Sequence, residues 1–171
     1  HAMKRPLETI RVVAGLKNDQ VYLVVIGPEE GVKASDCEKE AKRHNFNNLR
    51  VLGPLYDDEK LTAIGSCDLY VSLSHRENFN HCAAECLASG LPILLSSGND
   101  LGPEVVEARA GWHLSGDSEK DWAAGIESAL ATSTSDLWSM GQRGRSLVRD
   151  KFSFAGFKKR LKALEAKYGR P

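Results

Sequence analysis

The chain has 171 residues, 42% of them hydrophobic and 27% charged, and its 23 basic residues balance 23 acidic ones. This length and apolar content suffice for one globular domain with a sizeable core. Because the charges balance, no general field attracts nucleic acid or an anionic membrane, so any phosphate binding must be local. No apolar run approaches the roughly 18 residues of a membrane span, and no signal-peptide pattern opens the chain. The sequence therefore predicts a cytoplasmic, single-domain protein with no transmembrane segment and no nucleic-acid partner.

The four cysteines, Cys37, Cys67, Cys82 and Cys86, form no Cys-x-x-Cys pair. A domain of this size does not need disulfides, so reduced thiols are expected. Cys82 and Cys86 are one helical turn apart with His81 beside them, which is a possible metal-ligand spacing. A free cysteine more often packs as a small buried hydrophobe, so no metal site is predicted.

The chain is expected to begin with a helix and then a strand. Residues 1–3 are typical of a cloning remnant and are left out of the expected fold. Lys4 to Leu16 has a helical spacing of apolar residues. Val21 to Ile26 is an almost continuous apolar run that ends at Gly27-Pro28, which predicts a strand buried on both faces.

The next segments continue the alternation of helix and strand. A charged outer helix is expected from Lys33 to His44, and a second strand from Leu49 to Leu55. Asp57 or Asp58 is a suitable cap for a short helix, after which Leu69 to Leu73 predicts the third strand.

The second half follows the same pattern. Pro92 to Ser96 predicts a fourth strand, Gly102 to Ala108 a short helix, and Gly111 to Leu114 a short fifth strand. Ser118 to Asp121 resembles a capping box, and it predicts a helix with three apolar residues facing inward, Trp122, Ile126 and Leu130.

Two more helices are expected at the end of the chain. One is marked by Leu137, Met140, Gly144, Leu147 and Val148. The last runs from about Phe154 to Tyr168, with one apolar stripe, Phe157, Leu161, Leu164 and Tyr168, opposite a solvated basic face. Strands and helices that alternate in this way predict an α/β fold, an open Rossmann-like parallel sheet with helices on both faces.

The stretch from Ser74 to Pro92 is the most informative part of the sequence. Glu77 lies in a polar loop after the third strand, and Glu85 lies eight positions later inside a small-residue helix that ends at Gly90. A strand, a loop and a helix in this order place a ligand at the carboxyl end of a parallel sheet.

Two carboxylates suggest a glycosidase, whose acid and base are about 5 to 10 Å apart. Eight residues at the helical rise span about 12 Å, and the segment between them includes the start of a helix, where N–H groups favour an anion. A nucleoside diphosphate sugar fits this layout, with phosphates between the carboxylates and sugar or ribose hydroxyls on each carboxylate. The alternative is that Glu77 caps the helix and Glu85 faces solvent.

At this point the sequence resembles the retaining GT-B glycosyltransferases of group 1, also called family four. Glu77 to Glu85 matches the Glu-x7-Glu motif of that family, and the segment that follows, through Gly90 and Pro92, is similar to its Glu-Ala-x-Ala-x-Gly-x-Pro-Val. The strand Cys67 to Ser74 and the loop Gly102 to Val106 resemble the flanking motifs of the family.

The resemblance implies that residues 4–171 form one nucleotide-sugar-binding domain, the donor half of a GT-B fold. Catalytic Glu77 would contact the donor sugar, and Glu85 would hold the ribose. The remaining implied donor-binding residues are Lys4 at the diphosphate, Leu55 at the nucleobase, and Asn78, Phe79, Asn80 and His81 at the sugar and phosphate.

The implied reaction is metal-independent transfer of a hexose-type sugar from a nucleoside diphosphate, with no cofactor. The sequence has no Asp-x-Asp triplet to bridge a metal and a diphosphate, and it has no Ser-His-Asp or Cys-His set. The implied partners are the nucleotide sugar and an amino-terminal acceptor domain that this chain lacks, so the fragment alone is expected to be inactive. The sugar, the base, the acceptor and the oligomeric state are not specified.

Two departures from the family pattern stand out. Asn80 replaces a glycine, which carries a cost if that residue needs a positive φ. The strand that precedes Lys4 in the family, with its phosphate-binding arginine, is missing. A degenerate, non-catalytic interaction module of the same fold is therefore the alternative. An epimerase or phosphorylase relative and a receiver-like module fit less well, because their basic, histidine or acidic sites are not found in the sequence.

Overall fold

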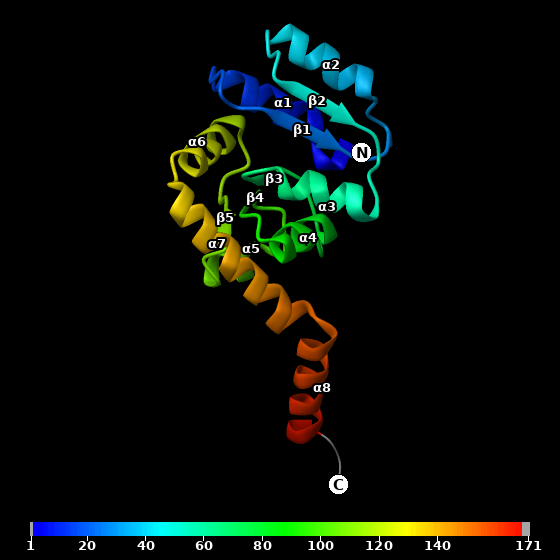
Figure 1. Cartoon of the computed structure of the whole chain (residues 1–171), viewed down its shortest axis with the longest axis vertical. Helices are drawn as coiled ribbons and strands as arrows, with labels where there is room; N and C mark the ends of the chain where they lie inside the picture. Colours follow the sequence, from blue (N-terminus) through cyan, green and yellow to red (C-terminus); the bar gives the residue numbers. More distant parts are fainter. Residues whose placement is uncertain (1, 169–171) are drawn as a thin grey trace.

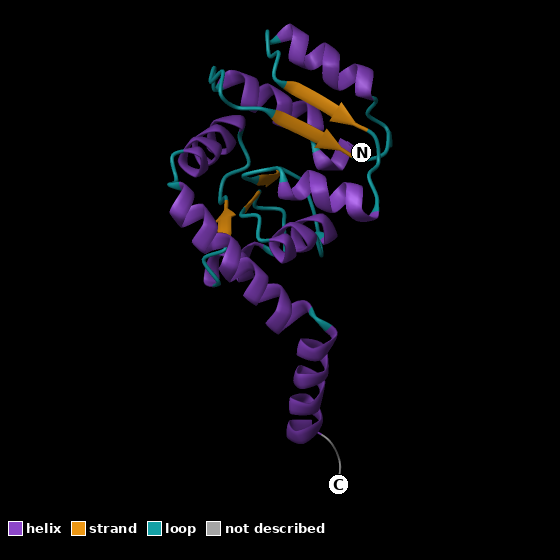
Figure 2. Cartoon of the chain, viewed as in Figure 1, coloured by secondary structure: helices purple, strands orange, loops and turns teal. Residues whose placement is uncertain are grey.

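The computed structural model describes residues 2–168, so His1 of the expected remnant and residues 169–171 of the expected domain lie outside the described residues. Within them the chain alternates between helices and parallel strands (Figures 1 and 2). The strands are β1 (Leu23–Ile26), β2 (Leu49–Leu52), β3 (Tyr70–Ser72), β4 (Ile93–Leu95) and β5 (Gly111–His113). The α-helices are α1 (Pro6–Gly15), α2 (Ala34–Arg43), α3 (Asp57–Gly65), α4 (His81–Ser89), α5 (Gly102–Glu107), α6 (Glu119–Leu130), α7 (Thr134–Leu147) and α8 (Phe154–Tyr168).

The strands form two parallel sheets and not one continuous sheet. One sheet has two strands in the order β1-β2, and the other has three in the order β3-β4-β5. Leu23 pairs with Leu49, while Tyr70 pairs with Ile93 and Ile93 pairs with Gly111. All the observed strands begin and end within a few residues of the expected positions, and the α/β fold class is confirmed.

The central strand β4 carries core residues on both of its faces. Ile93, Leu94 and Leu95 are fully buried. Ile93 and Leu95 belong to a cluster with residues of α4 and α5, whereas Leu94 packs with α1 and α6 residues such as Val13 and Trp122. Because side chains alternate across a strand, helices cover both faces of this sheet as predicted.

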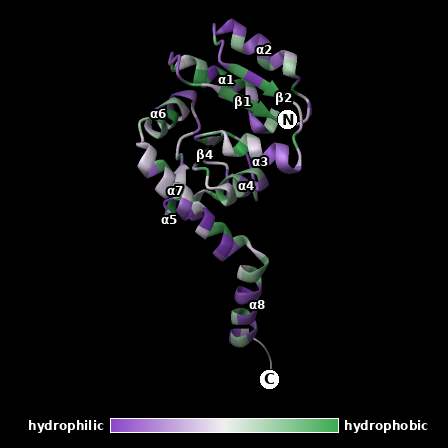
Figure 3. Cartoon of the chain, viewed as in Figure 1, coloured by the Kyte–Doolittle hydropathy of each residue, from purple (hydrophilic) through white to green (hydrophobic). Residues whose placement is uncertain are grey.

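The strand β1 differs from the expectation of burial on both faces. Leu23 and Val25 pack toward a third core cluster of α1 and α2, around Ile10. Val24 and Ile26, on the other face, are 37% and 38% exposed. The expectation was wrong because β1 and β2 form a separate sheet and one face of β1 remains partly exposed. Figure 3 shows that β1 itself is hydrophobic along its length.

Several helix ends depart from the sequence pattern. Tyr56, and not an aspartate, occupies the N-cap of α3, and Asp57 is the first helical residue with a φ of 44°. Ser118 caps α6 with the expected capping box, but Leu130 is 42% exposed because it lies at the last position of that helix.

The residues just before α1, which include part of the expected remnant, lie against the loop after β3. Ala2 to Lys4 form a 3₁₀ turn, η1 (Ala2–Lys4). Met3 accepts a backbone hydrogen bond of 2.9 Å from the N–H of His75, just after β3. The start of the chain is thereby fixed beside the loop that carries Glu77.

The carboxyl-terminal part extends away from the rest of the molecule (Figure 1). After α7 a π-helical turn, η2 (Val148–Phe152), leads into α8. In α8 only Gly156 is buried. The expected apolar stripe is largely exposed, since the side chains of Phe157 and Leu164 are each more than half exposed.

Candidate functional site

Glu77 lies in the loop between β3 and α4, and the loop after β4 holds its backbone. Its N–H donates to the Gly98 carbonyl at 2.8 Å, and its carbonyl accepts from the Asp100 N–H at 2.9 Å. The two loops lie so close that a Cβ on Gly98 would be 2.1 Å from the carbonyl oxygen of His75. Only glycine fits there, so the two loops form one rigid rim at the carboxyl ends of β3 and β4.

Below this rim is a buried polar network centred on Asn80, which is 2% exposed. The Asn80 Nδ2 donates to Ser72 Oγ at 3.1 Å and to Asn99 Oδ1 at 3.0 Å. Asn99 in turn donates to Ser96 Oγ at 3.0 Å, and Ser96 donates to the Ser74 carbonyl at 2.6 Å. Unlike Asn80, the side chains of Ser72, Ser96 and Asn99 were not singled out by the sequence analysis. They lie at or after the ends of two parallel strands, and that placement is the signal that predicts them.

Asn80 also caps α4, because its Oδ1 accepts from the Ala83 N–H at 3.1 Å. Its φ is −76°, in the ordinary extended range. The concern that this residue needs a positive φ therefore does not apply. Its side chain points into the domain, so the expected donor contact is left to its backbone and not to its amide group.

The first turn of α4 presents free amide groups. Ala83 donates to the Asn80 side chain and Ala84 to the Asn80 carbonyl, at 3.1 and 3.0 Å. Within residues 2–168 the N–H groups of His81 and Cys82 have no recorded acceptor. The start of a helix favours the binding of an anion, because its unpaired N–H groups and the positive end of the helix dipole both point there.

Glu77 forms an ion pair with Lys4, from the segment before α1. The Glu77 side chain is 13% exposed and that of Lys4 is 54% exposed. Glu77 also lines an open cavity of about 500 Å³ together with Met3, Arg76, Asn78 and Phe79. The structure thus brings together three of the predicted residues, Glu77, Asn78 and Phe79, with Lys4 held at Glu77.

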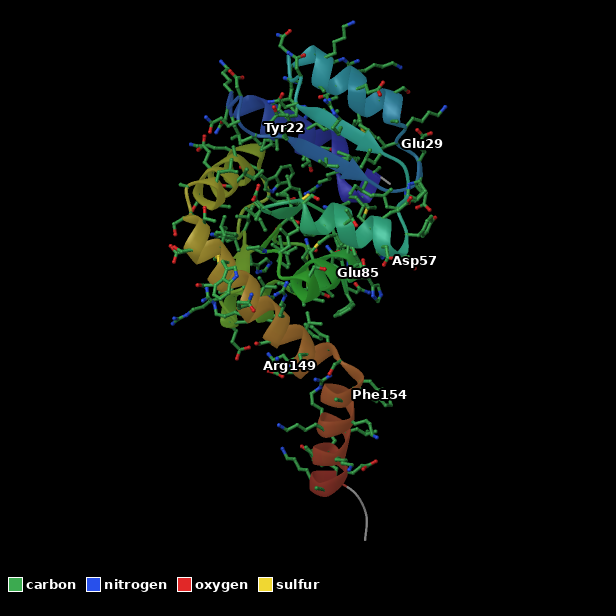
Figure 4. All side chains as sticks on the ribbon, viewed as in Figure 1. Tyr22, Glu29, Asp57, Glu85, Arg149 and Phe154 are labelled. Atoms are coloured by element: carbon green, nitrogen blue, oxygen red, sulfur yellow. The ribbon has the colours of Figure 1, made fainter. Side chains whose placement is uncertain are left out.

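Glu85 lies elsewhere on α4 and pairs with a different lysine. Lys60 Nζ, from α3, is 2.7 Å from Glu85 Oε1. This hydrogen bond raises the pKa of Lys60. Figure 4 shows Glu85 on α4 beside α3, at whose start Asp57 is labelled. Lys60 was missed by sequence analysis because residues 25 positions apart on two helices give no local pattern.

The aromatic residues of the site make edge-to-face contacts. The Phe79 ring is 5.1 Å from the His81 ring and 5.3 Å from the ring of Phe152 in η2. Phe79 remains 39% exposed, and His81 is exposed. Leu55, in the loop between β2 and α3, is half-buried and does not line the cavity around Glu77.

Arg5 connects the start of the chain to the loop after β3 and to the segment between β5 and α6. Its guanidinium donates to Asp117 at 2.6 and 3.0 Å, lies 2.9 Å from His75 Nδ1, and sits 4.9 Å from the centre of the Trp122 ring. The hydrogen bond from Arg5 lowers the pKa of Asp117. Arg5 has a φ of 53°, so its left-handed backbone turns the chain from η1 into α1.

The cysteines near the site do not assemble with His81. Cys86 is buried, which raises the pKa of its thiol to about 12, while Cys82 is exposed. Among residues 2–168, no three His, Cys, Asp or Glu side chains are arranged as metal ligands. In the same part of the chain, every helix is too short or too polar to cross a membrane.

The chain is similar to known proteins in both sequence and fold. A family profile described as "Glycosyl transferases group 1" matches residues 1–147. No curated protein matches the chain significantly. Among solved structures, the carboxyl-terminal domain of a group 1 glycosyltransferase family protein (LpcC) from Francisella tularensis is 20% identical with a TM-score of 0.75, over 90% of this chain and 82% of that one.

Two longer solved chains are similar over most of this one. A glycosyltransferase from Rickettsia africae has 16% identity and a TM-score of 0.80, over 95% of this chain and 44% of that one. Anabaena HepE, solved in complex with UDP-glucose, has 15% identity and a TM-score of 0.74, over 93% of this chain and 44% of that one. The chain therefore spans less than half of these two proteins, and at such identities the likeness shows the fold.

Proposed function

The chain belongs to the group 1 glycosyltransferases, and from this premise we propose that it is the domain that binds the nucleoside diphosphate sugar in a retaining, metal-independent transferase. Transfer of the sugar requires an acceptor domain joined to it. The observation that carries the proposal is the arrangement of Glu77 and Glu85 on either side of the open first turn of α4.

The diphosphate is assigned to the start of α4. The unpaired N–H groups of His81 and Cys82 donate to phosphate oxygens there, and the helix dipole adds a favourable potential. Asn80 helps to form this site, because its buried side chain holds the first turn of α4 in place and does not occupy the position proposed for the phosphate. Lys4, which lies beside the cavity, supplies a positive charge that offsets the negative charge of the Glu77 carboxylate.

The two carboxylates are assigned to the two ends of the donor. Glu77, at the cavity of about 500 Å³, accepts hydrogen bonds from hydroxyls of the sugar. Glu85, eight residues further along, accepts from the ribose hydroxyls, and Leu55 lies against the base. Asn78 and Phe79 complete the wall of the sugar cavity.

The residues of this chain orient the donor and stabilise charge during transfer. In a reaction with retention, the leaving phosphate takes the proton of the attacking acceptor hydroxyl on the same face of the sugar. The phosphate gains negative charge as its bond to the sugar breaks, and the N–H groups of α4 and Lys4 stabilise that charge. No general base from the side chains of this domain is needed.

A titration with UDP, GDP and ADP, followed by amide chemical shifts, tests the proposal. At least one nucleotide should shift the amide resonances of Phe79, His81 and Glu85, and the shifts should level off as the nucleotide concentration rises. In the variant Glu85→Gln the affinity for that nucleotide should fall about tenfold, since a charged acceptor is lost. Glu38→Gln, an exposed carboxylate on α2, is the matched control and should bind like the parent. Absence of shifts with all three nucleotides and their glucose and mannose conjugates would overturn the proposal.

A further inference from the structure

The side chain of Lys60 reaches the proposed ribose-binding carboxylate, Glu85, from outside the sequence motif, as that of Lys4 reaches Glu77. Its Nζ lies 2.7 Å from Glu85 Oε1, and the two side chains are 35% and 40% exposed. The pair is thus partly shielded from solvent, and it joins two separate helices. Pairs of this kind retain more of their attraction than fully exposed ones.

The Lys60–Glu85 pair is also the side-chain link between α3 and α4. Within residues 2–168, no other hydrogen bond or ion pair joins the side chains of these two helices. No residue of α3 is buried, so its apolar packing against the domain is limited. Leu55 lies two residues before Asp57, where α3 starts, so the position of α3 also determines where the proposed base contact lies relative to Glu85.

The ion pair leaves Glu85 able to accept further hydrogen bonds. An ionised carboxylate has about four lone-pair positions, of which Lys60 uses one. Among residues 2–168 no hydrogen bond to Glu85 Oε2 is found, and Oε1 keeps a second position. A vicinal diol, with two hydroxyls on neighbouring carbons, needs two acceptor positions and finds them on a carboxylate that is held in a fixed rotamer.

We propose that Lys60 is a positioning residue that orients the Glu85 carboxylate for the two ribose hydroxyls and thereby gives the domain its preference for ribonucleotides. Lys60 acts through Glu85 and does not contact the diphosphate. This inference rests on the proposed function, because it requires that Glu85 binds the ribose.

The test compares each nucleoside diphosphate with its 2′,3′-dideoxy form by isothermal titration calorimetry, using whichever of UDP, GDP or ADP binds the parent chain. In Lys60→Met the affinity for the ribonucleotide should fall about five- to tenfold, while that for the dideoxy form stays unchanged. Lys60→Arg should restore most of the ribonucleotide affinity. Lys159→Met, which removes one positive charge from the distant α8, should match the parent for both ligands.

A double-variant measurement separates this role from general stabilisation. In Glu85→Gln the preference for the ribonucleotide is already lost, so adding Lys60→Met should change neither affinity further. An equal loss for both ligands in Lys60→Met, or no loss for either, would overturn the inference. If the parent binds none of the nucleotides, the proposed function fails instead, and the two failures are thus distinguishable.

Discussion

Asn80 shows how one side chain supports both the helix and the rim above it. It caps α4 through Ala83 and bonds Ser72 and Asn99 below the two loops. A helix cap contributes about 1 kcal/mol, and each buried hydrogen bond contributes a similar amount. A glycine at this position would keep the backbone path but leave four groups without their Asn80 partner, since the Tyr70 hydroxyl also donates to Oδ1.

The variant Asn80→Gly should therefore lower the free energy of unfolding by about 1–3 kcal/mol. Nucleotide affinity should not rise, because the Asn80 side chain does not lie where the donor is proposed to bind. Urea denaturation and calorimetry measure the two quantities. Asn45→Gly is the control: Asn45 is exposed with a φ of 53°, so glycine should be tolerated there. A tighter-binding Asn80→Gly of unchanged stability would contradict this account.

Glu40 is a buried carboxylate that the sequence analysis did not single out. It is 5% exposed and accepts hydrogen bonds from Arg11 at 3.0 Å and from Arg43 at 3.1 Å, with His44 Nε2 at 3.4 Å. The hydrogen bond from Arg11 is the main reason that the pKa of Glu40 is lowered. Its ionised form is thus favoured in the folded state.

Glu40 should make the stability depend on pH in the acid range. Because its pKa is lower in the folded than in the unfolded chain, its contribution is complete above the unfolded value of about 4.3. The contribution is lost as the pH falls through the folded pKa. Glu40→Gln should cost about 1–3 kcal/mol at pH 7 and progressively less below pH 4, as measured by urea denaturation. Glu38→Gln should show no such pH dependence, and a constant cost for Glu40→Gln at all pH values would exclude this role.

At the scale of elements, α4 is held between α3 and α7, and its contact with α7 depends on glycine. A Cβ on Gly141 of α7 would lie 2.0 Å from the carbonyl oxygen of Gly90, the residue that ends α4. Gly90 itself has a φ of 83°, the left-handed conformation that closes a helix. The two helices therefore approach each other at backbone distance.

The variant Gly141→Ala should be destabilising by about 1–3 kcal/mol, because the added methyl group forces α7 away from α4. Gly15→Ala is the matched control, since a Cβ on Gly15, at the end of α1, meets nothing within 4 Å. That variant should be neutral or slightly stabilising. Thermal melting followed by circular dichroism compares the two, and equal melting temperatures would show that α7 can move without cost.

The sequence predicted the type and order of elements better than their environment. The apolar runs at β1 and β4 look alike, yet β4 is buried on both faces while Val24 of β1 is 37% exposed. A run of valine and isoleucine specifies a strand, but which helices cover it depends on the arrangement of the sheets. The cap of α3 was misplaced for a similar reason, since either Asp57 or Asp58 fits the local rule and the chain uses Tyr56.

The candidate site was predictable only as far as its local motif. Glu77 and Glu85 were found because both belong to one loop and helix. Lys4 contacts Glu77, 73 positions away, and its expected role at a diphosphate stays a prediction. Lys60 and the buried Asn99 come from other elements, and only the fold brings them together.

At the scale of the whole molecule, α8 contributes little to the core. It contacts the preceding turn η2, and its apolar residues remain exposed, with Phe154 at 76% (Figure 4). Burial of apolar area is the main stabilising term in a fold. A helix that buries only Gly156 therefore adds little to the stability of the rest.

A chain that ends after Ser153 should keep its melting temperature within about 2 °C of the parent, because less than about 1 kcal/mol of packing is lost. Its nucleotide affinity should be unchanged as well. Circular dichroism melting and calorimetry provide the two measurements. A much larger drop would show that α8 stabilises η2 and, through Phe152, the Phe79 loop.

The division of the strands into two sheets has a consequence for the exchange of amide protons with solvent. Leu23 and Tyr70 donate their N–H groups toward β2 and β4, at 2.9 and 3.0 Å. Along a strand successive N–H groups point to opposite sides, so those of Val24 and Val71 point to the outer edges of β1 and β3. In residues 2–168 neither sheet has a further strand at those edges. Deuterium should therefore replace the amide protons of Val24 and Val71 through local fluctuations, long before it reaches Leu94, whose exchange requires unfolding of the core.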